Sequence, residues 1–208
     1  MKRIVALVLA LIMTVCLCAC GKEAPSTEPN ETKKDSNAVK VDEGLLTIKI
    51  TVPASFLDEK DTPESLKKEA EERGFKSCTI NDDGSVTYEM TKSQRNDLLK
   101  EIKADMDTNL QEIIDDPECS IEKIDYNKDV TEFTAYTNDK YTAYDNLASI
   151  VFYMYGSLYQ IYNGVDSDDI DVKVKFINSE TKEVVFERSH KEFLNSAAAA
   201  AEDTSDKQ

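Results

Sequence analysis

Three stretches of this chain alternate apolar and polar residues in the way that is typical of β-hairpins. Each is interrupted by a short run of turn-favouring residues, and apolar residues recur at every second position on either side of that run. The hairpins are expected at 76–90, 120–136 and 170–187. Because a hairpin pairs its two strands antiparallel through a local turn, this pattern limits the chain to folds in which most strand pairs are antiparallel.

Helical periodicity follows the first two hairpins, and we expect helices at 92–115 and 143–162. Thr91 and Gln94 have the spacing of a capping box at the start of the first helix, and Gly164 is suited to end the second. A strand at 46–52, a short helix at 66–73 and a weak last helix after a second capping box at Ser189 complete the pattern. The fold class predicted is α+β, with a largely antiparallel sheet built of β-hairpins and helices packed on one face.

The first residues match the leader of a bacterial lipoprotein. Lys2 and Arg3 are followed by the apolar residues 4–15 and by Leu17-Cys18-Ala19-Cys20. These last four resemble a lipobox, which implies cleavage before Cys20 and diacylation of its thiol, and two acyl chains anchor a protein stably. The alternatives are an ordinary secretory leader or a short membrane anchor, but the apolar run is shorter than the roughly 20 residues that a span needs.

Composition suggests four segments. We expect a lipoprotein signal peptide at 1–19, a lipidated cysteine with a disordered tether at 20–44, a single α+β domain at 45–195, and a polar, Ala-rich tail at 196–208.

The formal net charge of −16 argues against nucleic acid as a partner, because phosphates are bound by clustered Lys and Arg. The expected partners are therefore the membrane, through the lipid anchor, and an unknown surface ligand or envelope protein.

The helix at 143–162 is rich in tyrosine. One stripe of it is aliphatic, and we expect this stripe to be buried against the sheet; it consists of Leu147, Ile150, Val151, Met154 and Leu158. Tyr153 instead projects among small and polar residues, which suggests that it is exposed. The aromatic side chains either complete the core or form a shelf for a ligand, and the candidate contacts are Tyr153, Tyr155, Tyr159 and Tyr162.

Two further cysteines follow Cys20, namely Cys78 and Cys119, each near the start of an expected hairpin. Outside the cell they could form a disulfide, which would stabilise the fold by roughly 4 kcal/mol in the chain-entropy model. They could equally be two small buried apolar residues. The strand order decides between these alternatives, because it sets the distance between their Cα atoms.

The sequence contains little that suggests catalysis. It has one histidine, His190, and none of the common nucleophile, zinc or phosphate-binding motifs. The aspartates between Asp166 and Asp171 fail the EF-hand pattern, since the sixth place is Asp171 instead of Gly and the twelfth is Ile177 instead of Glu. No enzyme activity, cofactor or metal site is predicted.

Three stretches resemble a group of small, uncharacterised lipoproteins of Gram-positive anaerobes. They are residues 81–88, residues 152–156 together with Asn163-Gly164, and residues 174–178. Some members of that group are labelled as similar to the N-terminal region of the antigen I/II adhesins, and the resemblance implies a role in surface adhesion.

The function predicted is that of a membrane-anchored, noncatalytic binding or adhesion module on the extracellular face of the cell membrane. The alternatives are an accessory or structural subunit of an envelope complex and, in third place, a hydrolase that uses paired carboxylates.

Overall fold

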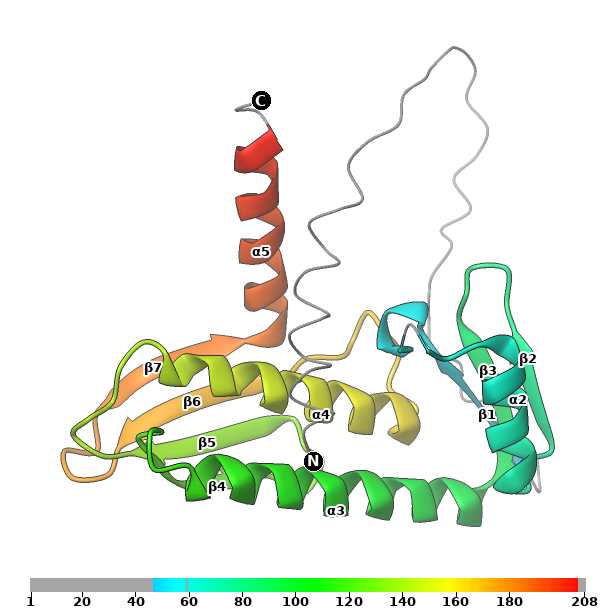
Figure 1. The fold of residues 1–208 in the computed structure, drawn as a ribbon, viewed down its shortest axis with the longest axis horizontal. Helices are drawn as coiled ribbons and strands as arrows, with labels where there is room; N and C mark the ends of the chain where they lie inside the picture. Colours follow the sequence, from blue (N-terminus) through cyan, green and yellow to red (C-terminus); the bar gives the residue numbers. More distant parts are fainter. Residues whose placement is uncertain (1–46, 59, 206–208) are drawn as a thin grey trace. The chain divides into compact units, whose positions relative to one another are not determined.

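The computed structural model describes residues 47–58 and 60–205 (Figure 1). The expected signal peptide, the tether and the lipidation site at Cys20 lie outside this part of the chain. The described residues up to Leu194 belong to one compact unit, and α5 continues beyond it. The strands are β1 (Thr47–Val52), β2 (Ser77–Ile80), β3 (Val86–Thr91), β4 (Ile121–Tyr126), β5 (Glu132–Thr137), β6 (Lys173–Asn178) and β7 (Val184–Ser189). The helices are α2 (Pro63–Glu72), α3 (Lys92–Asp115), α4 (Ala148–Asn163) and α5 (His190–Ser205), with short 3-10 turns η1 (Ala54–Phe56) and η2 (Asp145–Leu147).

The α+β class is confirmed, but the strands form two sheets. The first sheet has the order β1-β3-β2 and is antiparallel throughout. The second has the order β4-β5-β6-β7, and its central pair, β5 and β6, is parallel. The pair is parallel because α4 connects the two strands and returns the chain to the end of the sheet at which β5 began.

The three expected hairpins are present as β2–β3, β4–β5 and β6–β7, all antiparallel. Gly84 closes the first turn with a φ of +80°, a conformation that glycine adopts without strain. In the second turn the buried Val130 has a φ of +55°, which is rare for a β-branched residue. The Asn127 side chain supports this turn, since its Oδ1 accepts hydrogen bonds from the backbone N–H groups of Thr131 and Glu132.

The helix starts follow local capping. Thr91 and Gln94 form the expected capping box of α3.

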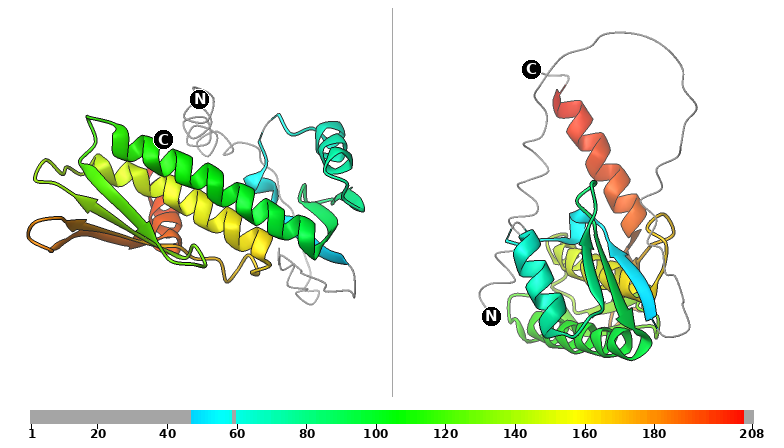
Figure 2. Two further views of the ribbon diagram at one scale, coloured as in Figure 1. Left: turned by 90° about the horizontal axis from the view of Figure 1, so that it is seen from below. Right: turned by 90° about the vertical axis from the view of Figure 1, so that its right-hand side faces the viewer.

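Helices α3 and α4 lie side by side (Figure 2). Helix α4 begins at Ala148, later than expected, because the Asp145 carboxylate accepts hydrogen bonds from the backbone N–H groups of Thr142 and Ser120 and holds the preceding segment in a turn.

Helix α4 packs on the second sheet through a face that the sequence analysis did not select. Phe152 is fully buried between Phe133 and Phe176. Its ring stacks on that of Phe133, with 5.0 Å between the ring centres. A Cβ atom on Gly156 would lie 2.5 Å from Val172 Cγ2, so the backbone of α4 comes very close to the Val172 side chain. The aliphatic stripe is not the buried face, since Leu147 is 62% exposed and the rest of the stripe is only partly buried.

Candidate functional site

The tyrosines of α4 do not form a shared exposed surface. Tyr153, expected to be exposed, is only 3% exposed, so that prediction is wrong. Its hydroxyl donates to the backbone oxygen of Arg188 at 3.2 Å, and its ring stacks on His190 with 5.3 Å between ring centres. Tyr153 lies on the same face of α4 as Gly156, and this face is buried because its small residues let the helix approach the sheet closely.

The other three tyrosines have different neighbours. Tyr155 is 6% exposed, and its hydroxyl accepts a hydrogen bond from Asn109 Nδ2 at 2.7 Å. Tyr159 is partly buried, with the Lys103 ammonium group 4.7 Å from its ring centre. Tyr162, at the end of α4, is the only one of the four candidates in the lining of the cavity described next.

A cavity of about 130 Å³ lies where β1, β3, η1 and α2 meet α3 and α4. Polar and apolar atoms contribute about equally to its exposed wall, and four aromatic rings are part of the lining. The lining residues are Val52, Phe56, Leu57, Asp61, Leu66, Glu69, Ala70, Arg73, Phe75, Tyr88, Leu98, Leu158 and Tyr162. The cavity thus brings aromatic rings and a few charged groups together around a space that suits one compact chemical group.

Two phenol groups supply polar atoms to the wall of this cavity. Burial raises the pKa of Tyr162 to about 12, with further contributions from Glu69 and Asp61, and burial likewise raises the pKa of Tyr88. Both phenols therefore stay protonated at neutral pH. Among residues 47–58 and 60–205, neither hydroxyl has a side chain or backbone group as its hydrogen-bond partner. Each is thus available to a ligand.

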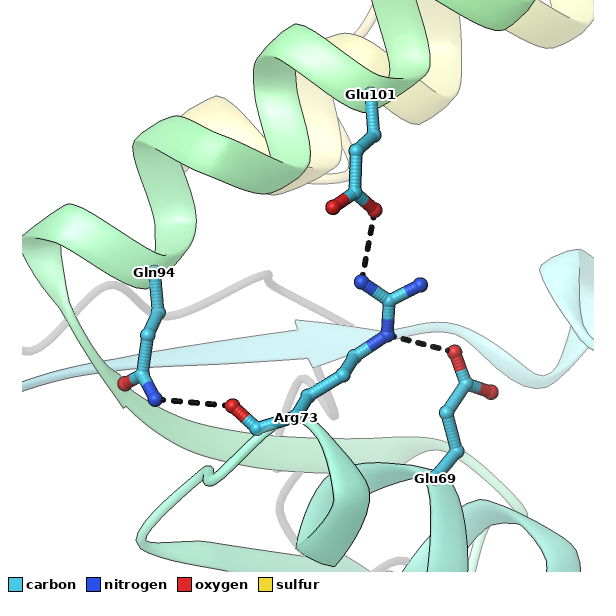
Figure 3. A network of polar contacts seen from close by, with 4 residues as sticks. All are labelled: Glu69, Arg73, Gln94 and Glu101. Atoms are coloured by element: carbon cyan, nitrogen blue, oxygen red, sulfur yellow. Dashed lines mark hydrogen bonds and ion pairs between the residues drawn. The ribbon is translucent and has the colours of Figure 1, made fainter.

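The polar rim of the cavity is organised by Arg73 at the end of α2 (Figure 3). Its Nε donates to Glu69 at 2.9 Å and a terminal nitrogen donates to Glu101 of α3 at 2.8 Å. Gln94 Nε2 donates to the Arg73 backbone oxygen at 3.1 Å, which adds a second link to α3. With Asp61 also in the lining, carboxylates outnumber cations at the rim, and the one guanidinium is already paired twice.

The two cysteines are free thiols in different hydrophobic clusters, so the disulfide alternative is not realised. Burial raises the pKa of both thiols, which keeps them protonated and poorly nucleophilic. Cys119 lies near Asp145, with 3.7 Å from its sulfur to the carboxylate. A neighbouring carboxylate disfavours the thiolate further, so neither cysteine is suited to catalysis.

A serine–histidine pair could not be predicted from the sequence, because its two residues come from separate elements. Ser157 Oγ lies 3.3 Å from Nδ1 of His190. Ser157 is 0% exposed, and the nearby Asp171 carboxylate accepts hydrogen bonds from the backbone N–H groups of Val172 and Lys191. A substrate cannot reach a buried hydroxyl of this kind, and the pair is structural.

Within the part of the chain that the structure describes, no group of three or more potential ligand side chains is arranged to hold a metal ion. The acidic segment at 166–171 forms a turn in which the Asp166 backbone oxygen accepts from the N–H groups of Asp169 and Ile170. None of the described helices has the length and apolar character needed to cross a membrane. Comparison with family models, with characterised proteins and with solved structures found no match to this chain.

Proposed function

We propose that this protein is a noncatalytic binding module, held on the extracellular face of the cell membrane by a lipid on Cys20. The observation that supports the proposal is the cavity bounded by Tyr88 and Tyr162, whose hydroxyls have no partner among the described residues. Its volume of about 130 Å³ suits one compact group of a ligand, because an engineered apolar cavity of roughly 150 Å³ binds benzene.

Ala70 offers a way to test the cavity directly. It is 3% exposed and lies in the cavity wall, so Ala70→Leu would place a larger side chain in the space that a ligand would use. We expect a small-molecule screen by ligand-observed NMR, on the full chain in a sugar-headgroup detergent, to find ligands whose signals are lost with Ala70→Leu.

The matched control is Tyr144→Ala, because Tyr144 is 82% exposed and outside the cavity lining. Circular dichroism and thermal unfolding of both variants would establish that they are folded. Ligands that bind equally well to Ala70→Leu would show that the cavity is not the site, and a screen without any ligand would contradict the proposed function.

An accessory role in an envelope complex is the second candidate. It is favoured by two large apolar side chains exposed just before α4, Tyr144 at 82% and Leu147 at 62%. Exposed apolar groups that lie close together mark contact surfaces for other proteins. If the protein is such a subunit, the double variant Tyr144→Ala, Leu147→Ala would lose co-purification with a membrane protein. Ala70→Leu would leave this co-purification intact.

A further inference from the structure

Aromatic rings form a substantial part of the cavity lining. Four rings line it, from Phe56, Phe75, Tyr88 and Tyr162. Phe75 and Tyr88 meet edge to face, with 5.7 Å between ring centres. Aromatic rings attract cations through the negative potential of their faces, and cages of several rings recognise quaternary ammonium groups.

The charges of the lining also favour a cation as the ligand. Asp61 and Glu69 belong to the lining, and Arg73 is its one cationic residue. The Arg73 guanidinium is paired with Glu69 and Glu101 at 2.9 and 2.8 Å, so it is not free to receive an anion. Asp61 and Glu69 also act on both phenols, since each carboxylate contributes to raising the pKa of Tyr88 and of Tyr162. Their negative potential therefore extends to the polar atoms of the wall.

Size and exposure limit what can enter. About 130 Å³ holds a compact group such as trimethylammonium, but not a sugar ring with its hydroxyl shell or a long acyl chain. Tyr88 is 7% exposed, and no described side-chain or backbone group pairs with its hydroxyl. A cation bound among these rings loses part of its hydration shell, which strengthens its attraction to rings and carboxylates.

We propose that the cavity binds a compact alkylammonium group, held by the four aromatic rings and by the negative potential of Asp61 and Glu69. The inference rests on the proposed binding function and adds the chemical class of the ligand. Such a group occurs in free amines and in phosphocholine headgroups. The free cation is the favoured source, because the headgroup would bring a phosphate close to Asp61 and Glu69.

The test compares choline with 3,3-dimethylbutan-1-ol, in which a carbon atom replaces the charged nitrogen and the shape is kept. Calorimetry on the full chain in a sugar-headgroup detergent should show choline binding at least about tenfold more tightly, which corresponds to about 1.4 kcal/mol. Asp61→Asn and Tyr162→Leu should each reduce this preference. Glu72→Gln is the control, because Glu72 lies on α2 like Glu69, is exposed and is outside the lining.

The outcomes separate the inference from the proposed function. Equal affinity for choline and its neutral analogue, with both lost in Ala70→Leu, would overturn the cation inference and leave the binding module intact. If other ligands enter the cavity but choline does not bind, the cation inference is likewise overturned while the proposed binding function stands. Binding of phosphatidylcholine vesicles that exceeds binding of phosphatidylglycerol vesicles and of free choline would support the inference and assign the lipid headgroup as its source.

Discussion

At Gly156, helix α4 comes very close to other parts of the compact unit. A Cβ atom added there would lie 2.5 Å from Val172 Cγ2 and 2.8 Å from the Val130 backbone oxygen. Glycine usually weakens a helix by about 1 kcal/mol relative to alanine, so Gly156→Ala would be stabilising if space allowed. Because the contacts forbid it, we expect the free energy of unfolding to fall by about 1 to 3 kcal/mol.

Urea unfolding of Gly156→Ala, Val172→Ala and the double variant would measure this effect. Removing both Val172 methyl groups relieves two of the three close approaches, so the double variant should lose less stability than the sum of the single losses. Additive losses would mean that the helix shifts away from Val172 at little cost.

His190 gives the protein a stability that depends on pH. Burial lowers its pKa below the ordinary 6.5, and Asp171 opposes that shift. As the pH falls below about 6.5, the unfolded chain binds a proton at this imidazole before the folded protein does. Stability from this residue is therefore complete above pH 6.5 and is lost as the pH falls towards the folded pKa.

We expect His190→Gln to reduce the loss of unfolding free energy between pH 7 and pH 5, measured by urea titration at each pH. His190 is the one histidine of the chain, so no other imidazole contributes. At lower pH both proteins should lose stability together, since carboxylates such as Glu89, whose pKa is lowered by its hydrogen bond from Lys76, become protonated there. An unchanged slope between pH 7 and pH 5 would rule out this role of His190.

At the level of single elements, the hairpins and the capped helices could be predicted from the sequence, whereas the orientation of α4 could not. Turn residues and capping boxes act within a few positions of the chain, so they can be read locally. Helix α4 is apolar around most of its circumference, and periodicity alone does not choose its buried face. Close approach to the sheet selected the face with Gly156 and Ser157, where a large aliphatic residue would not fit.

This orientation predicts contrasting effects for two apolar residues of the α4 region. Phe152→Ala should lower the free energy of unfolding by about 3 to 5 kcal/mol, because the ring is fully buried between other aromatic rings. Leu147→Ala should change it by less than about 0.5 kcal/mol, since Leu147 is 62% exposed. Chemical denaturation of both variants checks the prediction, and a larger loss for Leu147→Ala would restore the aliphatic stripe as the buried face.

The start of α3 depends on the capping box. The Thr91 side chain accepts from the backbone N–H of Gln94, and the Gln94 side chain accepts from the backbone N–H of Thr91. Thr91→Ala should cost about 1 kcal/mol of stability, and Thr91→Ser should restore most of it because serine keeps the accepting hydroxyl oxygen. Equal stability of the Ala and Ser variants in thermal unfolding would show that the cap contributes nothing measurable.

At the level of the whole molecule, neither the division of the seven described strands into two sheets nor the cavity beside the first sheet could be predicted from the sequence. Strand alternation shows which residues share a face, but not which strands become neighbours. The cavity draws residues from β1, η1, α2, β3, α3 and α4, and only Tyr162 among them was a sequence candidate. Tyr88 falls within the first expected hairpin, but an unpartnered hydroxyl leaves no local signal in the sequence.

Anchoring is a prediction about the chain outside the described residues. If Cys20 is acylated, Cys20→Ala should move the protein from the membrane fraction to the soluble fraction and abolish labelling by a fatty-acid probe. Cys18→Ala is the matched control, because the lipobox resemblance places the modified thiol at Cys20. Retention in the membrane with labelling intact would contradict the lipoprotein assignment.

The parallel pairing of β5 and β6 has a consequence for folding kinetics. The β4–β5 and β6–β7 hairpins close through local contacts, but β5 and β6 pair only after residues 138–172 have carried the chain back along α4. Pairings between distant parts of a chain form slowly, because the intervening segment must be ordered first. Docking of α4 would then limit the refolding rate, and destabilising changes at Gly156 would slow refolding.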